Sequence, residues 1–392
     1  MHVLSNADRG QESRALAVAA AGLLALAIAM GIGRFAFTPI LPMMEADAGL
    51  SLVAAGWLAS ANYLGYLIGA LCAARLSLAQ AVRGGLLLIA VVTFAMGLTH
   101  AFALQLLLRL LAGIASAWVL VHVSAWALGR LLALRRAEAN GVLFAGVGVG
   151  IAAAGLVCMG TMQLRWNSDC TWQLFGVLSL LATLVLWREF RGPGEAQPPG
   201  PRTSTRLHWD RDKWRLMACY GAFGFGYIIP ATYLPAMAHR YITNPLVFGW
   251  AWPVFGIAAA LSTWIAARWL RQVNDRRLWA ICYALMLTGV ALPAFWPTLT
   301  AILIAALLVG GTFMVVTMLG LREARRVADT EATAFIAVMT AAFAVGQIIG
   351  PLLVSAVAHR PHGFTIALLA AAAVLLLAAI SLWRSSRREA RV

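Results

Sequence analysis

The stretch GIGRFAFTPILPMM, residues 31–44, returns in altered form 193 residues later as GFGYIIPATYLPAM, residues 224–237. Two glycines and a Leu-Pro pair occupy the same places in both copies. The same shift pairs further residues: Gly56 and Trp57 with Gly249 and Trp250, and Arg83 with Arg276. A constant offset across two apolar segments and the loops after them indicates an internal duplication. The chain is therefore predicted to contain two related halves.

The composition is that of a membrane protein, because 62% of the 392 residues are hydrophobic and only 11% are charged. Apolar stretches of about 18 to 25 residues, each long enough to cross about 30 Å of hydrocarbon, recur along the whole chain. We read the first as a retained span and not as a cleaved signal peptide. The predicted spans are 15–38, 52–73, 84–99, 103–128, 139–162, 171–189, 214–237, 247–270, 278–296, 298–320, 332–357 and 363–383.

A polar segment separates the sixth and seventh spans. It reads RGPGEAQPPGPRTSTRLHWDRDKW, residues 191–214, and its proline, glycine and charge suit neither hydrocarbon nor a compact core. We therefore predict an all-α membrane protein with an N-terminal six-helix half (1–189), a cytoplasmic linker (190–213) and a C-terminal six-helix half (214–392).

The net charge of +15 serves as a topology signal. With the N-terminus in the cytoplasm, 25 of the 30 Lys and Arg residues fall on cytoplasmic segments. Three fall on external segments, namely Arg165, Arg240 and Arg360. The positive-inside rule then places both termini in the cytoplasm, and this distribution argues against nucleic-acid binding.

Two parallel six-helix halves around a midplane site are typical of the major facilitator superfamily. The stretch at 31–44 resembles the first-helix signature of the bacterial YbfB-like branch of that superfamily, whose members are described as transporters of unassigned substrate. The fourth span is similar to the superfamily's fourth-helix motif, with Arg109 and Gly113. Two other motifs depart from the pattern, with Ala73 in place of an Asp and Ile151 in place of a Pro, so import and export both stay open.

The resemblance implies a secondary transporter of the bacterial inner membrane that moves a small organic solute by alternating access. It also implies that helices 1, 4, 7 and 10 line the central cavity. We expect a monomer in the lipid bilayer, with protons as a candidate coupling ion and without cofactor or metal.

Two arginines, Arg34 and Arg109, lie within predicted spans, where a charge costs about 3 kcal/mol on insertion scales. Both fall in the outer third of the membrane. Arg34 aligns with Tyr227 under the 193-residue shift, so it is an addition to the shared scaffold. We predict that both arginines bind substrate. The rival interpretation is that Arg34 reaches outward or pairs with Glu45 or Asp47, which requires the helix to break near Pro39 and Pro42.

The fifteen acidic residues are all expected in loops, termini or the first turn of a span. A midplane carboxylate relay is therefore not predicted, and the candidate proton carriers are His122 in the fourth span or an edge carboxylate such as Glu45 or Asp47. Fixed positive charge favours an anionic or carboxylate-bearing solute, with neutral polar solutes as the alternative. The predicted substrate-binding residues are Arg34, Phe37, Asn62, Tyr66, Arg109, Trp118, Tyr227, Tyr233 and Gln347.

Glycines four residues apart allow helices to pack closely, and in a rocking carrier they also allow the halves to slide. We predict these packing or gating roles for a set of small residues and prolines. They are Gly31, Gly33, Pro42, Gly146, Gly150, Gly346, Gly350 and Pro351.

Other function classes find less support. The sequence carries no phosphate-binding loop, no HExxH and no intramembrane carboxylate pair, which disfavours a membrane-embedded enzyme. A sensor or receptor on a transporter fold stays open as the main alternative, and a channel is disfavoured by the resemblance.

Overall fold

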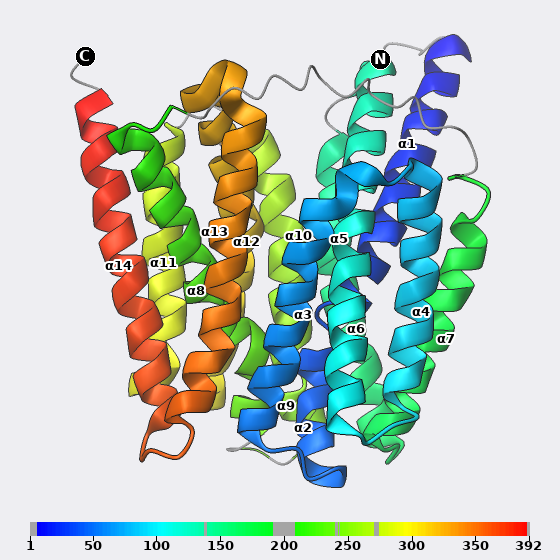
Figure 1. Cartoon of the computed structure of the whole chain (residues 1–392), viewed down its shortest axis with the longest axis vertical. Helices are drawn as coiled ribbons and strands as arrows, with labels where there is room; N and C mark the ends of the chain where they lie inside the picture. Colours follow the sequence, from blue (N-terminus) through cyan, green and yellow to red (C-terminus); the bar gives the residue numbers. More distant parts are fainter. Residues whose placement is uncertain are drawn as a thin grey trace.

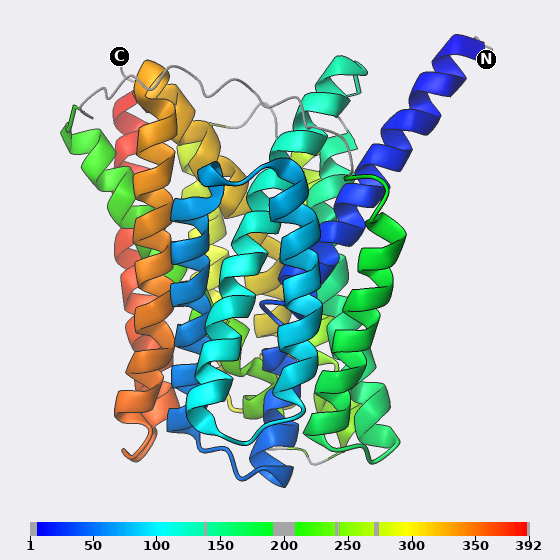
Figure 2. The ribbon, with the colours of Figure 1, turned by 45° about the vertical axis from the view of Figure 1, so that its right-hand side comes forward.

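The computed structural model describes residues 6–136, 139–190, 208–239, 242, 244–269 and 274–389. Helices run nearly parallel through these residues, which contain no strand (Figures 1 and 2). The first six-helix half contains α1 (Asn6–Leu26), a π-helix (Ala27–Ile32), α2 (Phe37–Asp47), α3 (Leu52–Cys72), a 3-10 turn (Ala73–Arg75), a second π-helix (Gln80–Gly84), α4 (Gly85–Met96), α5 (Phe102–Ala133), α6 (Asn140–Gln163) and α7 (Ser168–Leu186). The second contains α8 (Arg211–His239), the short α9 (Pro245–Phe248), α10 (Ala251–Trp269), α11 (Asp275–Phe295), α12 (Leu299–Ala328), a 3-10 turn (Asp329–Glu331), α13 (Ala332–Val357) and α14 (Gly363–Glu389).

The predicted all-α fold with twelve spans is confirmed. Nine helical segments of the described chain are long and apolar enough to cross a membrane. Two shorter apolar helices, Gln80–Met96 and Ala251–Ala266, and the 29-residue α8 complete the twelve. Most of the predicted linker, residues 191–207, and Arg240 lie outside the described residues.

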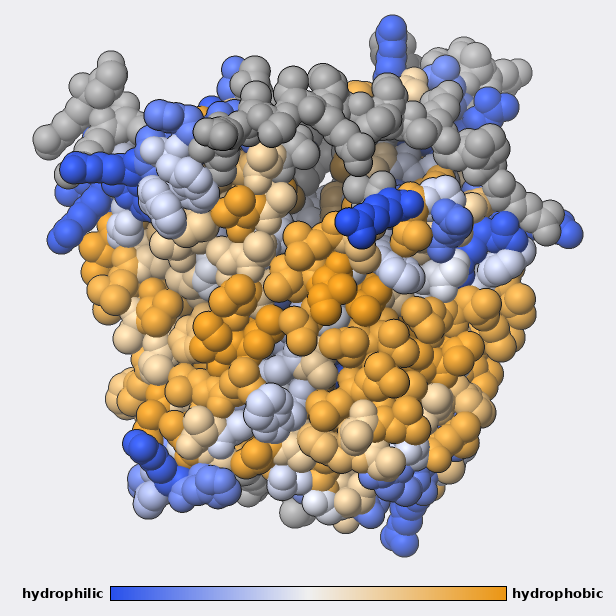
Figure 3. Space-filling view, viewed as in Figure 1, coloured by the Kyte–Doolittle hydropathy of each residue, from blue (hydrophilic) through white to orange (hydrophobic). Residues whose placement is uncertain are grey.

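The surface carries an apolar band. Hydrophobic side chains cover the middle of the face drawn in Figure 3, and hydrophilic ones gather at both ends. The start of α1 and the end of α14 lie at the same end of the bundle (Figure 1), which we call the terminal side; the other end is the far side. Such a band fits a protein that passes through the hydrocarbon layer many times.

The first span is broken at residues 33–36, ahead of Pro39 and Pro42, the two prolines near which a break was considered. The amides of Gly33 and Phe35 bond to the carbonyls of Ile28 and Met30, five residues back, at 2.9 and 3.0 Å. This π-helical pattern runs into a turn at residues 33–36, after which α2 continues to Asp47. Pro39 lies in the first turn of α2, where a helix needs few amide donors, so it does not cause a break.

The two halves meet along three helix pairs: α3 with α13, α6 with α10, and α2 with α8. Hydrogen bonds between the halves run from the middle of the bundle to its far side. Thr38 Oγ1 donates to Ala231 O at 2.8 Å, and Ser355 Oγ donates to Val53 O at 3.2 Å. The described structure is therefore closed by polar contacts on the far side.

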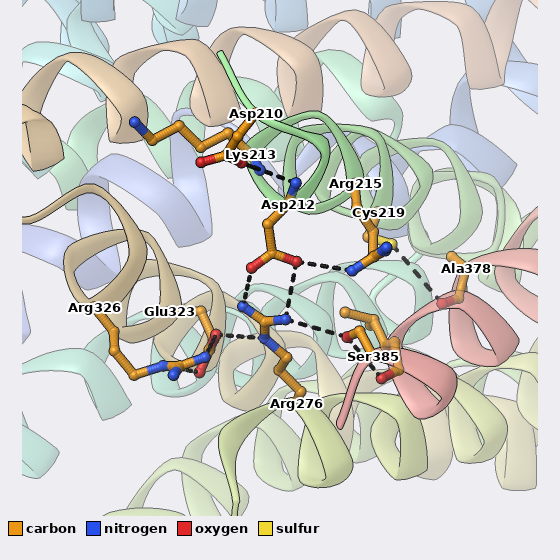
Figure 4. A network of polar contacts seen from close by, with 11 residues as sticks. Asp210, Asp212, Lys213, Arg215, Cys219, Arg276, Glu323, Arg326, Ala378 and Ser385 are labelled. Atoms are coloured by element: carbon orange, nitrogen blue, oxygen red, sulfur yellow. Dashed lines mark hydrogen bonds and ion pairs between the residues drawn. The ribbon is translucent and has the colours of Figure 1, made fainter. Parts of the chain in front are cut away.

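A buried charge network joins four helices on the terminal side of the second half (Figure 4). The Arg276 guanidinium, 2% exposed, donates to Glu323 Oε2 at 2.8 Å and to both carboxylate oxygens of Asp212. It also donates to Ser385 Oγ at 3.3 Å, and Arg326 donates to Glu323. We expected Glu323 in a loop after residue 320, but α12 continues to Ala328, so this carboxylate lies inside a helix and is buried.

A second ion pair ties the start of α8 to the turn before α13. Lys213 Nζ lies 2.6 Å from Glu331 Oε2, and the His208 amide also donates to this carboxylate. The Lys213 hydrogen bond, followed by that of His208, holds the pKa of Glu331 below its ordinary value of 4.5. The contact therefore joins α8 and α13 above that pH.

Exchange of this carboxylate for an amide tests the ion pair. Because the folded pKa is lowered, the stabilisation is present above the unfolded pKa and is lost as the pH falls through the folded pKa. Glu331→Gln should lower the melting temperature at pH 7, and the difference from wild type should shrink below pH 4.5. Melting curves of both proteins between pH 7 and pH 3 measure this, and a difference that is constant with pH would contradict the assignment.

Candidate functional site

Arg34 lies at the break in the first span, in the turn between the π-helix and α2. It is 2% exposed, although it carries a full charge. Its NH2 group donates to Gln347 Oε1 at 2.5 Å, across the boundary between the halves. Its Cζ atom lies 4.0 Å from the ring centroid of Tyr66 and 5.3 Å from that of Tyr63, so cation–π contacts hold the guanidinium in place.

Arg109, on α5, is also 2% exposed and lies beside the same break. Its NH2 group donates to Arg34 O at 3.2 Å, and its Cζ atom lies 5.0 Å from the ring centroid of Phe37. Asn62 Nδ2 donates to Gly33 O at 3.2 Å and to Arg109 O at 2.9 Å. The carbonyls of Gly33 and Arg34, which the broken helix leaves free, thus accept hydrogen bonds from side chains, and this makes irregular backbone tolerable at membrane depth.

The charge at this site is not balanced by an acid. Among the described residues, no carboxylate forms an ion pair with Arg34 or Arg109. The Nε atom of each is buried without a hydrogen-bond partner within the same part of the chain. The pairing of Arg34 with Asp47 is not found, because Asp47 accepts hydrogen bonds from the amide and hydroxyl of Ser168 at the start of α7. Two adjacent buried cations thus keep unused donors.

The second half contributes an amide and a wall of aromatic rings. Gln347 Nε2, on α13, donates to the hydroxyl of Tyr227 on α8. The Tyr227 ring stacks on Phe313 at 5.0 Å and on Phe343 at 5.7 Å between centroids. From the first half, Phe35 meets Phe313 edge-on at 6.3 Å. The Arg34 guanidinium therefore lies at the seam between the halves, next to rings that can contact the body of an organic molecule, and Arg109 lies beside it in the first half.

Of the predicted substrate-binding residues, the structure gathers six around the break and one beside it. Arg34, Asn62, Tyr66, Arg109, Tyr227 and Gln347 form the core of the site, and Phe37 flanks Arg109. Our prediction omitted Phe313 and Phe343. A signal for Phe313 was present, since it lies on the tenth span, which the family resemblance implies to line the cavity.

Three predicted residues lie elsewhere. Trp118 Nε1 donates to Cys72 Sγ at 3.2 Å. His122, one turn further toward the terminal side, has Nδ1 3.0 Å from Trp118 O and Nε2 3.1 Å from Leu76 O. Tyr233 is fully buried toward the far side, where its ring meets Phe364 edge-on. We therefore leave Trp118 and Tyr233 out of the candidate site and treat His122 separately.

The glycines of the first half pack within it. A Cβ at Gly146 would lie 2.4 Å from Leu23 O, one at Gly150 2.4 Å from Ala27 O, and one at Gly31 2.4 Å from the Gly150 carbonyl carbon. A Cβ at Gly33 would lie 2.6 Å from Ser116 Oγ. These positions allow the first span to approach α6 and α5 closely.

The glycines of the second half pack in the same manner. A Cβ at Gly346 would lie 2.4 Å from Gly221 O of α8, and one at Gly350 would meet the Ile228 side chain at 2.3 Å. The prolines of the set, Pro42 and Pro351, lie inside α2 and α13.

A different glycine of the GVGVG stretch carries the contact between the halves. A Cβ at Gly148 would lie 2.5 Å from Gly256 O and from Ala260 N, both on α10. A Cβ at Gly155 would lie 2.5 Å from Pro253 Cδ on the same helix. The seam between α6 and α10 is thus packed backbone against backbone.

Twelve helices in two six-helix halves, with a buried polar site at their seam, define a membrane carrier of the major facilitator type. The family model described as "Uncharacterised MFS-type transporter YbfB" matches residues 26–382, so the chain belongs to this family of transporters. The curated protein "Uncharacterized MFS-type transporter YceJ" of Bacillus subtilis (strain 168) is 29% identical over 165 residues. That match spans 40% of this chain and 40% of the relative.

Solved structures support the same fold. The nucleoside transporter NupG superposes with a TM-score of 0.70 over 93% of this chain and 98% of its own. A bacterial homologue of the human lysosomal transporter Spinster, in an inward-facing and occupied conformation, superposes with a TM-score of 0.67 over 98% of both chains. Each is 14% identical to this chain, a level that shows the fold and not the solute. The chain is a multi-pass membrane transporter and not an enzyme.

Proposed function

We propose that the protein moves a small organic anion across the bacterial inner membrane by alternating access, with 1–189 and 214–392 as the two rocking halves. One observation carries the proposal. Two buried guanidiniums, Arg34 at the seam and Arg109 beside it, have no carboxylate partner in the described chain, and each keeps an unused Nε donor. A bound acid group would offset the cost of burying these charges.

The geometry also suits an acid with an organic body. A carboxylate accepts two parallel hydrogen bonds from a guanidinium, and such bonds are stronger than those between neutral groups. Tyr66, Tyr227 and Phe313 offer ring faces and edges beside the charges. We therefore favour a carboxylate or similar acid attached to an apolar or planar group over a neutral polar solute.

The state of the transporter follows from where the halves touch. Contacts between the halves, such as Thr38 with Ala231, close the far side. We assign the terminal side to the cytoplasm because most Lys and Arg residues of the sequence belong there under the positive-inside rule. The structure then corresponds to a carrier closed toward the outside, and we propose that it functions as a monomer.

Proton coupling through His122 stays a proposal. Its two ring nitrogens lie within hydrogen-bond distance of two backbone carbonyls, Trp118 O and Leu76 O. A neutral imidazole has a single N–H group, so only the doubly protonated ring can donate to both carbonyls. His122 is therefore able to hold a proton on the terminal side, apart from the two arginines.

Pairs of acids and their neutral amides test the proposed function. We expect acids from a panel of monocarboxylates, dicarboxylates and aromatic carboxylates to raise the melting temperature of the purified protein, while the matching amides do not, because only the acid satisfies the guanidiniums. Arg34→Gln should remove the difference. Arg165→Gln, which changes an exposed arginine on the far side, is the matched control. Equal stabilisation by acids and amides would contradict an anion carrier.

Acids that bind are then measured for counterflow in proteoliposomes. A carrier exchanges labelled for unlabelled solute with saturation. Binding without counterflow would favour the alternative, a receptor on a transporter fold.

A further inference from the structure

Gln347 is the contact through which the second half reaches Arg34. Its side-chain oxygen lies 2.5 Å from Arg34 NH2, and its amide nitrogen is held by the Tyr227 hydroxyl. Gln347 is fully buried, so this chain of Arg34, Gln347 and Tyr227 runs through the closed seam without access to solvent. The oxygen of Gln347 thus accepts a hydrogen bond from an Arg34 donor of the kind that also bonds to acid oxygens.

A carrier without solute has to bury the guanidiniums of Arg34 and Arg109 when its site closes. When the site is open, water hydrates the guanidiniums; when it closes without solute, that hydration is lost and a buried donor without a partner destabilises the closed state. Gln347 replaces one of the lost water bonds by its amide oxygen. A neutral amide also yields to an acid, because a hydrogen bond between two charged groups is stronger.

We infer that Gln347 stands in for the acid group of the solute and thereby allows the empty site to close. For the transport cycle, this inference rests on the proposed function. The solute displaces Gln347 from Arg34 when it binds, and Gln347 returns when the solute leaves, so the carrier can reorient without cargo. Gln347 is a positioning residue. It determines whether the carrier can perform net transport of solute, which requires an empty carrier to reorient, in addition to exchanging one solute for another.

Three substitutions separate this role from general packing. Gln347→Leu keeps a side chain of similar bulk but removes the acceptor, and Gln347→Glu supplies a permanent carboxylate for Arg34. Thr38→Val is the matched control, since it also removes one buried hydrogen bond between the halves, from Thr38 Oγ1 to Ala231 O, without touching Arg34.

The direct test measures the far side in protein without any solute. Spin labels are placed at Ala48→Cys and Arg360→Cys, two exposed far-side positions on different halves, after the five native cysteines have been replaced. Pulsed electron paramagnetic resonance then gives the distribution of distances between the two spin labels. We expect a short distance for wild type, at most a small shift for Thr38→Val, a much larger shift to longer distances for Gln347→Leu, and a still larger share of the short distance for Gln347→Glu.

A wild-type distribution in Gln347→Leu would overturn the inference, and so would an equal shift in Thr38→Val. Because this measurement needs no solute, its outcome is independent of the acid and amide pairs that test the proposed function. In proteoliposomes with an acid that passes the counterflow assay, Gln347→Leu should lower net uptake about tenfold or more beyond any loss of exchange, as expected when a hydrogen bond to a charged group is lost. Equal loss of both would contradict the inference.

Discussion

Replacing Arg34 by alanine is expected to reduce solute counterflow by about 100-fold or more, since truncation of a buried charged contact typically costs that much affinity. The folded protein should persist. No carboxylate of the described chain is paired with Arg34, so its removal leaves no acid buried alone. Only the neutral Gln347 oxygen loses its donor, so the melting temperature should fall little. Loss of transport with the fold retained distinguishes a binding role from a structural one.

Arg34→Lys sharpens this prediction. Lysine keeps the charge but lacks the planar fork that bonds an acid and stacks on Tyr66, so counterflow should fall well below wild type. Arg165→Ala, in an exposed far-side arginine, should leave counterflow unchanged. If Arg34→Ala transports at the wild-type rate, this residue has no part in solute binding.

Replacing Arg276 by leucine is expected to cost about 3 kcal/mol of stability, the lower end of the usual penalty for breaking a buried ion pair from one side, because Arg215 and Arg326 still bond to the two carboxylates. The substitution leaves Asp212 and Glu323 without the cation that bonds to both of them. The joint between α8, α11 and α12 on the terminal side would then open. Thermal unfolding of the purified protein measures the loss, and a lower yield of folded protein is expected as well.

The duplicated sequence supplies a matched control for this prediction. Arg83 aligns with Arg276 under the 193-residue shift, but its guanidinium stacks on the Trp187 ring at 3.8 Å, and the positions that align with Asp212 and Glu323 are Ala19 and Arg130. Arg83→Leu therefore orphans no carboxylate and should cost about 1 kcal/mol. Equal destabilisation by the two substitutions would show that the network around Arg276 contributes no more than packing.

The repeat and the apolar spacing predicted the fold, because hydrocarbon demands long apolar helices wherever the chain crosses it. The helix ends were less predictable. Long helices extend past the apolar region into charged sequence, as α12 does at Glu323, and hydropathy does not report such an extension. The break at residues 33–36 was also missed, since it depends on side chains of α3 and α5 that bond to the freed carbonyls of Gly33 and Arg34.

The charged members of the site were predictable because an arginine at membrane depth needs a reason. The identity of the aromatic residues that surround these arginines was not predictable. Helices that are apolar on every side give no pattern from which to fix their rotation, so Tyr233 and Trp118 looked as suitable as Tyr227. The Gln347 contact joins positions 313 residues apart and depends on how the halves dock.

The backbone contact between Gly148 and Gly256 has a consequence for energy conservation in the cell. Where Gly148 faces Gly256, no side chain lies between α6 and α10, and the helices cannot separate there without leaving a void. In the alternating-access cycle proposed above, the halves would therefore roll about this line, and one entrance would narrow as the other widens. A fulcrum of this kind would keep the two entrances from opening together in the proposed cycle, which is the condition for a membrane that stays electrically sealed while cargo crosses.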